Sequence, residues 1–184
     1  MNVKIACFSL GVICLLTGCS FFHRSGTLTE NLRLSPDKEF VVVNKEKFSR
    51  GGGILVLPFT AGVDVPATDE LDRLSLRIVQ GMADAFQGQP SKFKLLMADT
   101  GNAADVFVRG HITRVSAAGT LKKILPGHQR KVLTVAGEVL EAKTRQVLFK
   151  FVLTRKTETA QEDLENLGLR VGTEIGGRIL TAAQ

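Results

Sequence analysis

The chain has 184 residues, of which 44% are hydrophobic and 23% charged. These values are near the averages of folded globular proteins, so they exclude a chain that is disordered throughout and predict one domain with a real core. The formal net charge is +6 and its cations are dispersed along the chain, which argues against the clustered basic arm of a nucleic-acid-binding protein.

The first eighteen residues have the pattern of a bacterial lipoprotein signal peptide. Lys4 supplies a short positive segment, and residues 5–16 form an apolar run of leader length that is too short to span a bilayer. The run ends in Leu16-Thr17-Gly18-Cys19, which resembles a lipobox. Cleavage between Gly18 and Cys19 would leave Cys19 as a mature N-terminus that carries diacylglycerol and further acyl chains, palmitate among them. The alternative is an ordinary secretory leader with a coincidental cysteine.

The residues around Cys19 also bear on localisation and on cysteine chemistry. Ser20 differs from the aspartate that resembles an inner-membrane retention signal, so we expect the periplasmic face of the outer membrane. Cys7 and Cys14 lie within the leader that would be removed. The mature domain is therefore expected to contain neither a disulfide nor a cysteine-based metal site.

Residues 19–52 are predicted to be mainly a flexible tether, because they mix Ser, Asn, Pro, Lys and Gly with little periodicity. A β-branched run at residues 40–43 interrupts this tether and favours an edge strand over an exposed adhesive stretch. Three consecutive glycines, residues 51–53, precede a strand rather than a helix. They are thus poorly placed to bind phosphate and are predicted to be a flexible linker.

Residues 53–184 are predicted to form a periplasmic domain with the element order β-α-β-β-β-β-α. Strands are expected where apolar runs or period-two alternation occur, and helices where apolar residues recur every three or four positions. The predicted strands are 54–59, 94–97, 106–113, 131–142 and 147–153, and the predicted helices are 71–86 and about 160–182.

The last predicted helix contains Gly168, Gly172 and Gly176, spaced by four residues along one side. Each glycine costs roughly 1 kcal/mol against alanine in a helix, so a close contact is expected to compensate for it. Packing within the domain is the favoured interpretation, because Arg170, Glu174 and Arg178 argue against a membrane-embedded glycine motif.

No pattern in the sequence predicts an active site, a metal or another cofactor. His23, His111 and His128 share no visible cluster, and the familiar hydrolase, nucleotide-binding, zinc and calcium motifs do not occur. A site assembled only in space would escape such a search, since catalytic triads are defined by geometry rather than by order in the chain. We expect the protein not to be an enzyme.

A basic tip is predicted between two strands, over residues 114–131. It is defined by five residues that bracket an apolar and glycine-containing segment: Lys122, Lys123, His128, Arg130 and Lys131. The tip is either a solvated loop or a contact with a partner protein, an anionic lipid or the cell wall.

Four stretches resemble a family of bacterial envelope lipoproteins that includes the curli-secretion lipoprotein CsgG and the penicillin-binding-protein activator LpoB. They are the lipobox at Cys19 and residues 54–59, 104–112 and 139–148. The last is similar to the family's turn between strands, although Glu141 and Arg145 replace its aspartate and glycine. The resemblance implies a periplasmic α/β sandwich, with helices against a mixed sheet, that acts as a binding module.

These observations favour a lipid-anchored accessory lipoprotein that docks onto a larger envelope machine, such as a cell-wall synthase or a secretion or surface-appendage complex. The membrane, through the lipid, and an envelope protein are the expected partners, and a homo-oligomer is possible in principle. The first alternative is a structural oligomer or ring in an outer-membrane secretion complex. The second is a small envelope enzyme without a recognisable motif.

Overall fold

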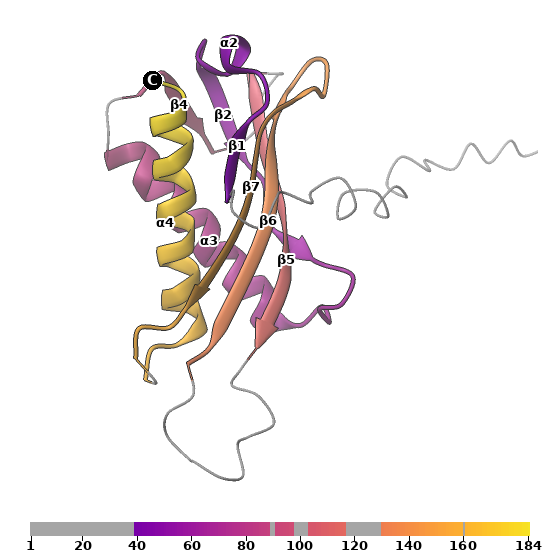
Figure 1. The fold of residues 1–184 in the computed structure, drawn as a ribbon, viewed down its shortest axis with the longest axis vertical. Coiled ribbons are helices and arrows are strands. Elements are labelled where there is room, and N and C mark those ends of the chain that lie inside the picture. The colour runs from indigo at the N-terminus through magenta and orange to yellow at the C-terminus, as the bar shows by residue number, and fades with distance from the viewer. Residues whose placement is uncertain (1–38, 89–90, 98–102, 117–129, 160) are drawn as a thin grey trace, which may run out of the picture.

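The computed structural model describes residues 39–88, 91–97, 103–116, 130–159 and 161–184 (Figure 1). Seven strands and three helices occur in this part of the chain. In chain order they are β1 (Phe40–Val42), α2 (Lys45–Phe48), β2 (Gly52–Val56), β3 (Thr60–Ala61), α3 (Asp69–Gly88), β4 (Phe93–Leu96), β5 (Val106–Ser116), β6 (Val132–Glu141), β7 (Val147–Lys156) and α4 (Leu164–Ala182).

The strands form one mixed sheet in the order β1-β7-β6-β5-β2-β4, with β3 paired to β5. The β5, β6 and β7 strands are antiparallel neighbours, whereas β2 lies parallel to both β4 and β5. The long helices α3 and α4 pack together against the sheet (Figure 1). The predicted α/β fold and its mixed sheet are thereby confirmed. The predicted strands and helices occur in the predicted order, and the structure adds the two-residue strand β3 between β2 and α3.

The first elements that the structure describes lie within the stretch that the sequence predicts as tether. β1 pairs antiparallel with β7, so residues 40–42 are the edge strand that the β-branched run favours. The following helix α2 begins at its N-cap Asn44, whose side chain accepts a hydrogen bond from the Lys47 amide, and it buries Phe48. The Phe48 ring stacks on that of Phe149 at 5.3 Å, which makes α2 part of the core.

The linker interpretation of the three glycines at residues 51–53 is wrong. Gly52 and Gly53 begin β2, and Gly51 and Gly52 have φ values of +73° and +114° that other residues rarely adopt. A Cβ on Gly52 would lie 2.4 Å from a carboxylate oxygen of Asp105, and the amide of Gly53 donates to the same carboxylate at 2.7 Å. These glycines therefore allow a close approach between β2 and the start of β5.

The glycine stripe of α4 packs within the domain, as predicted. A Cβ on Gly172 would lie 2.0 Å from the carbonyl oxygen of Ile78 in α3, and one on Gly176 would lie 2.7 Å from the Ala85 side chain. The contact is reciprocal, because a Cβ on Gly81 of α3 would lie 2.0 Å from the carbonyl oxygen of Leu169. The backbones of α3 and α4 thus approach each other more closely than larger residues would permit.

Candidate interaction site

The residues predicted to form a functional site fall into two groups. Gly18, Cys19 and three members of the basic tip, namely Lys122, Lys123 and His128, lie outside the described residues. The other two members, Arg130 and Lys131, come just before β6. Arg130 is exposed, whereas Lys131 is half-buried.

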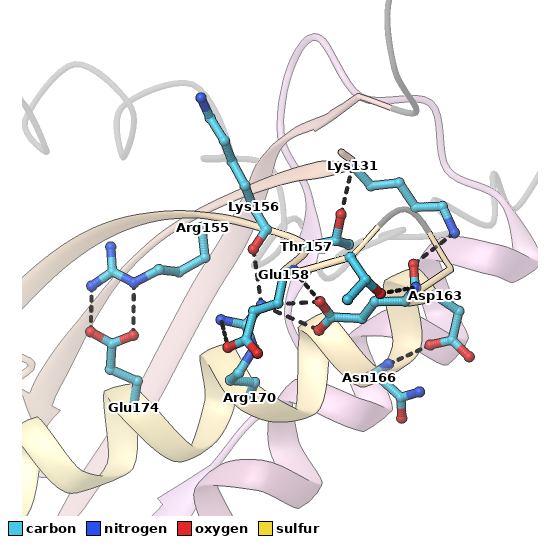
Figure 2. A network of polar contacts seen from close by, with 11 residues as sticks. Lys131, Arg155, Lys156, Thr157, Glu158, Asp163, Asn166, Arg170 and Glu174 are labelled. Carbon is cyan, nitrogen blue, oxygen red and sulfur yellow. Dashed lines mark hydrogen bonds and ion pairs between the residues drawn. The ribbon is translucent and has the colours of Figure 1, made fainter. Parts of the chain in front are cut away.

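Lys131 is held by the connection between β7 and α4 rather than being free to bind a partner (Figure 2). Its amide donates to the Thr157 hydroxyl at 3.0 Å, and the Thr157 amide donates to the Lys131 carbonyl at 2.9 Å. Its Nζ donates to the carbonyl oxygen of Glu162 at 3.1 Å. Lys131 therefore joins the start of β6 to the start of α4, a role that its charge alone does not indicate.

Arg170 of α4 organises the same connection. One guanidinium nitrogen donates to the Lys156 carbonyl at 2.9 Å and lies 3.2 Å from the Glu162 carboxylate, and the other lies 3.3 Å from Glu158 (Figure 2). The helix begins at the N-cap Asp163, whose carboxylate accepts from the Asn166 amide at 2.6 Å. These contacts hold the strand-to-helix connection in place beside Lys131.

A second ion cluster joins β7, α4 and the residue that precedes β1. Arg155 donates to both carboxylate oxygens of Glu39, at 2.8 and 3.0 Å, and also pairs with Glu174, a contact visible in Figure 2. The hydrogen bond from Arg155 lowers the pKa of Glu39 below its ordinary value of 4.5. The two carboxylates in turn raise the pKa of Arg155, so its charge is permanent. The cluster fastens the start of the domain to its last helix.

A cavity of about 490 Å³ lies where β5 ends and α3 and α4 begin. Its lining combines apolar and polar residues from the β3–α3 connection, both helices and β5. They are Asp64, Val65, Pro66, Thr68, Glu70, Leu71, Leu74, Thr113, Arg114, Val115 and Leu164. A volume of this size falls within the range of ordinary ligand or side-chain binding pockets. Sequence reasoning missed this cavity, because its walls come from four separate segments.

The face of the sheet opposite α3 and α4 has a charged pair at its centre. Glu138 of β6 is only 4% exposed, and it accepts hydrogen bonds from Nε and Nη2 of Arg109 at 2.8 and 2.6 Å. The two residues are direct partners in the β5–β6 register. Such buried pairs are retained only with good geometry, because an unpaired buried carboxylate is costly. A signal existed in the sequence, since Arg109 directly follows three apolar residues of β5 and Glu138 lies between small and apolar residues of β6.

His111 lies on β5 next to this pair, as the sequence predicts for a residue within a strand. Its Nδ1 lies 2.6 Å from the Thr60 hydroxyl of β3. Burial lowers the pKa of His111 below 6.5, and nearby Arg109 lowers it further while Glu138 opposes them. The imidazole is thus held neutral between neighbouring strands, which indicates a structural role.

The turn between β6 and β7, which carries part of the family resemblance, is held by its own polar residues. Glu141 accepts from Nζ of Lys47 at 2.8 Å and also bonds the Thr144 hydroxyl, and these hydrogen bonds lower its pKa. Arg145 has a φ of 60°, and its guanidinium lies 4.8 Å from the centre of the Phe107 ring. The turn therefore contacts α2 through Lys47 and covers Phe107 of the interior strand β5.

Among the described residues, no three His, Cys, Asp or Glu side chains gather in a way that could hold a metal ion. Within the same part of the chain, no helix is long and apolar enough to cross a membrane. What this part does present is a cavity and a polar connection between β7 and α4.

No family model matches the sequence, and no curated protein matches it. Several solved structures share the fold. The PelC dodecamer from Paraburkholderia phytofirmans matches with a TM-score of 0.50 and 11% identity, over 70% of this chain and 88% of that one. Protein XCC0632 from Xanthomonas campestris matches with a TM-score of 0.50 and 14% identity, over 72% and 86%. A putative lipoprotein from Caulobacter crescentus has a TM-score of 0.46 and 11% identity, over 76% and 94%. The first two likenesses, each with a TM-score of 0.50, show the fold alone.

Proposed function

We propose that this protein is a lipid-anchored accessory lipoprotein of the bacterial cell envelope, without enzymatic activity, that docks onto a larger envelope machine. The observation that supports docking is the open cavity between β5, α3 and α4, whose described lining contains no histidine or cysteine and has apolar residues at its base. The lipobox that ends at Cys19 supports the anchor, and Ser20 supports the outer membrane as its place.

The partner machine that we propose is a cell-wall synthase or a secretion or surface-appendage complex. Its support is the resemblance of residues 54–59, 104–112 and 139–148 to the family that includes CsgG and LpoB. Several acyl chains on Cys19 would hold the protein at the membrane firmly, because each buried methylene contributes roughly 0.8 kcal/mol.

The anchor is tested by Cys19→Ser in the full chain. The thiol is the lipid acceptor, so the variant should accumulate as an unprocessed precursor or leave the outer-membrane fraction. Mass spectrometry of the wild-type N-terminus provides the direct measurement. An unmodified N-terminus at a residue other than Cys19 would contradict the anchor. Affinity purification through a C-terminal tag from detergent-solubilised membranes tests docking, and we expect a synthase or an envelope assembly complex.

A structural oligomer is the second candidate function. The specific observation in its favour is the fold shared with PelC from Paraburkholderia phytofirmans, whose solved structure is a dodecamer. Mass photometry of the detergent-solubilised, lipidated protein distinguishes the two candidates. A ring-sized particle that contains this chain alone would favour the oligomer, and a monomer or dimer would favour the accessory protein.

A further inference from the structure

We propose that the cavity between β5, α3 and α4 receives an aliphatic side chain of a partner protein, presented by a segment that also carries lysine or arginine. This inference rests on the proposed function, because it names the surface and the chemistry through which docking would occur. It is argued from the apolar base of the cavity, from the charges on its rim and from an exposed valine beside it.

The base of the cavity is apolar and already shielded from water. Leu71, Leu74 and Leu164 are 6%, 1% and 7% exposed, and Val65 and Val115 line the walls. Small apolar depressions surrounded by polar groups are the usual receptors for the anchor residues of protein interfaces. A branched aliphatic side chain would complete the packing that these leucines begin.

The lining of the cavity contains two acids, Asp64 and Glu70, and one cation, Arg114. Both acids are exposed, and neither forms an ion pair or accepts a hydrogen bond through its carboxylate within the part of the chain described here. The helix dipole favours acids at the start of α3. It does not account for Asp64, which precedes the helix.

A segment with cationic groups beside its anchor would therefore find complementary charge on the side of α3. Arg114, on the β5 wall, would repel those cations and so favour one orientation of the segment. Val63, next to Asp64, is 80% exposed. It extends the apolar surface beyond the cavity and would contact the residues that flank the anchor.

The test places a photo-reactive benzoylphenylalanine at Val63 of the full, lipidated chain in its native host. After irradiation, the cross-linked peptide is identified by mass spectrometry. We expect a segment of another envelope protein in which an aliphatic residue lies near lysine or arginine. The same photo-reactive residue at Gln87, exposed at the far end of α3, is the position control and should give no such product.

Two further variants test the chemistry of the rim and of the wall. Glu70→Lys should lower the yield of the cross-link at Val63 by about tenfold, because a like charge replaces a complementary one. Val65→Ser should lower the yield as well. Asp84→Lys makes the same charge change on an exposed acid of α3 outside the cavity and should leave the yield unchanged.

Several results would overturn the inference. These are the absence of a cross-link, a cross-link to a second copy or to residues 117–129 of this chain, a partner segment without cations, and a yield insensitive to Glu70→Lys. Failure of the proposed function is distinguished by fractionation of the same cells. A wild-type chain that is not lipidated, or not found in the membrane, contradicts the anchor whatever the cross-link shows.

Discussion

Gly172 and Gly177 lie on the same helix, α4, but their surroundings differ completely. A Cβ at Gly172 would lie 2.0 Å from the carbonyl oxygen of Ile78, whereas one at Gly177 would meet nothing within 4 Å. The backbone of α3 thus leaves no room for a side chain at Gly172, whereas no atom that the structure describes lies close enough to exclude one at Gly177. Residue type alone does not distinguish these positions, although spacing by four does mark the packed ones.

The first prediction compares these two glycines. Gly172→Ala should destabilise the domain by roughly 1–3 kcal/mol, because the added methyl must push apart two packed backbones. Gly177→Ala should be neutral or should stabilise the domain by up to about 1 kcal/mol through its better helix propensity. Urea unfolding followed by circular dichroism provides both values. Equal effects of the two substitutions would contradict close packing of α3 on α4.

Glu39 allows a prediction about acid stability. Its pKa is lowered in the folded state by the hydrogen bond from Arg155. A lowered pKa means that the contact stabilises the fold above the ordinary value of 4.5 and is lost as the pH falls through the lowered value. Glu39→Gln should therefore lower stability at about pH 7 and weaken the decline on acidification to about pH 3.

The matched control for this substitution is Glu70→Gln, because the Glu70 carboxylate forms no ion pair among the residues that the structure describes. Urea midpoints measured across the acid range should change little for that variant. If Glu39→Gln shows the same acid decline as the wild type, its contact with Arg155 does not contribute to stability.

At the scale of elements, the sequence predicts the long helices, the long strands and the short strands β1 and β4, but it does not predict β3 or α2. The apolar recurrence from Leu71 to Phe86 extends over several turns, and β5, β6 and β7 span at least ten residues each, long enough to contain stretches of period-two alternation. By contrast, β3 has two residues and α2 has four, too few to show a period. Their presence depends on tertiary contacts, such as the burial of Phe48.

The same reasoning explains what could be predicted of the candidate site. The basic tip follows from charges adjacent in the sequence, but the role of Lys131 depends on Thr157 and Glu162, which only the fold brings near. The cavity combines residues from Asp64 to Leu164, and a linear pattern contains no signal for such a combination. Local composition therefore predicts local features, whereas a cavity depends on how the fold brings distant segments together.

The third prediction concerns the start of the domain. A chain that begins at residue 51 lacks β1 and α2, so it loses the β1–β7 pairing and the ring contact of Phe48 with Phe149. We expect it to be less stable than a chain that begins at residue 39, by roughly 3–5 kcal/mol, the usual cost of removing a buried phenylalanine side chain. Thermal unfolding of both purified chains checks this expectation. Equal midpoints would show that the core begins only at β2.

At the scale of the whole molecule, several features lie at one end of the sheet. This is the end at which β5 ends and β6 begins (Figure 1). The cavity, the exposed Arg130 and the polar connection around Arg170 come from segments distant in sequence. Both long helices begin at this end. An anchored domain would therefore bring acidic, basic and apolar surfaces toward one partner together.

The fourth prediction tests the basic tip at this end. Reversing Lys122, Lys123 and Arg130 to glutamate should leave thermal stability unchanged, because charge substitutions in a loop, which the tip is predicted to be, usually alter it by no more than about 0.5 kcal/mol. The yield of partner in the affinity purification should fall, and the wild-type yield should depend on salt. Lys143→Glu, an exposed lysine at the β6–β7 turn, is the control. An unchanged yield would show that the tip is a solvated loop.

The contact between Glu39 and Arg155 has a mechanical consequence. If Cys19 is anchored in a membrane and the domain is bound to a partner, tension that is transmitted along the chain to Glu39 reaches the described part of the domain there. The first bonds to bear this load are the pair of hydrogen bonds from Arg155, followed by the edge strand β1 on β7. Arg155 also pairs with Glu174 of α4. Part of the load would therefore pass to this long helix instead of resting on the three-residue strand β1 alone. The ion cluster would therefore share the mechanical load with β1 and delay its separation from β7.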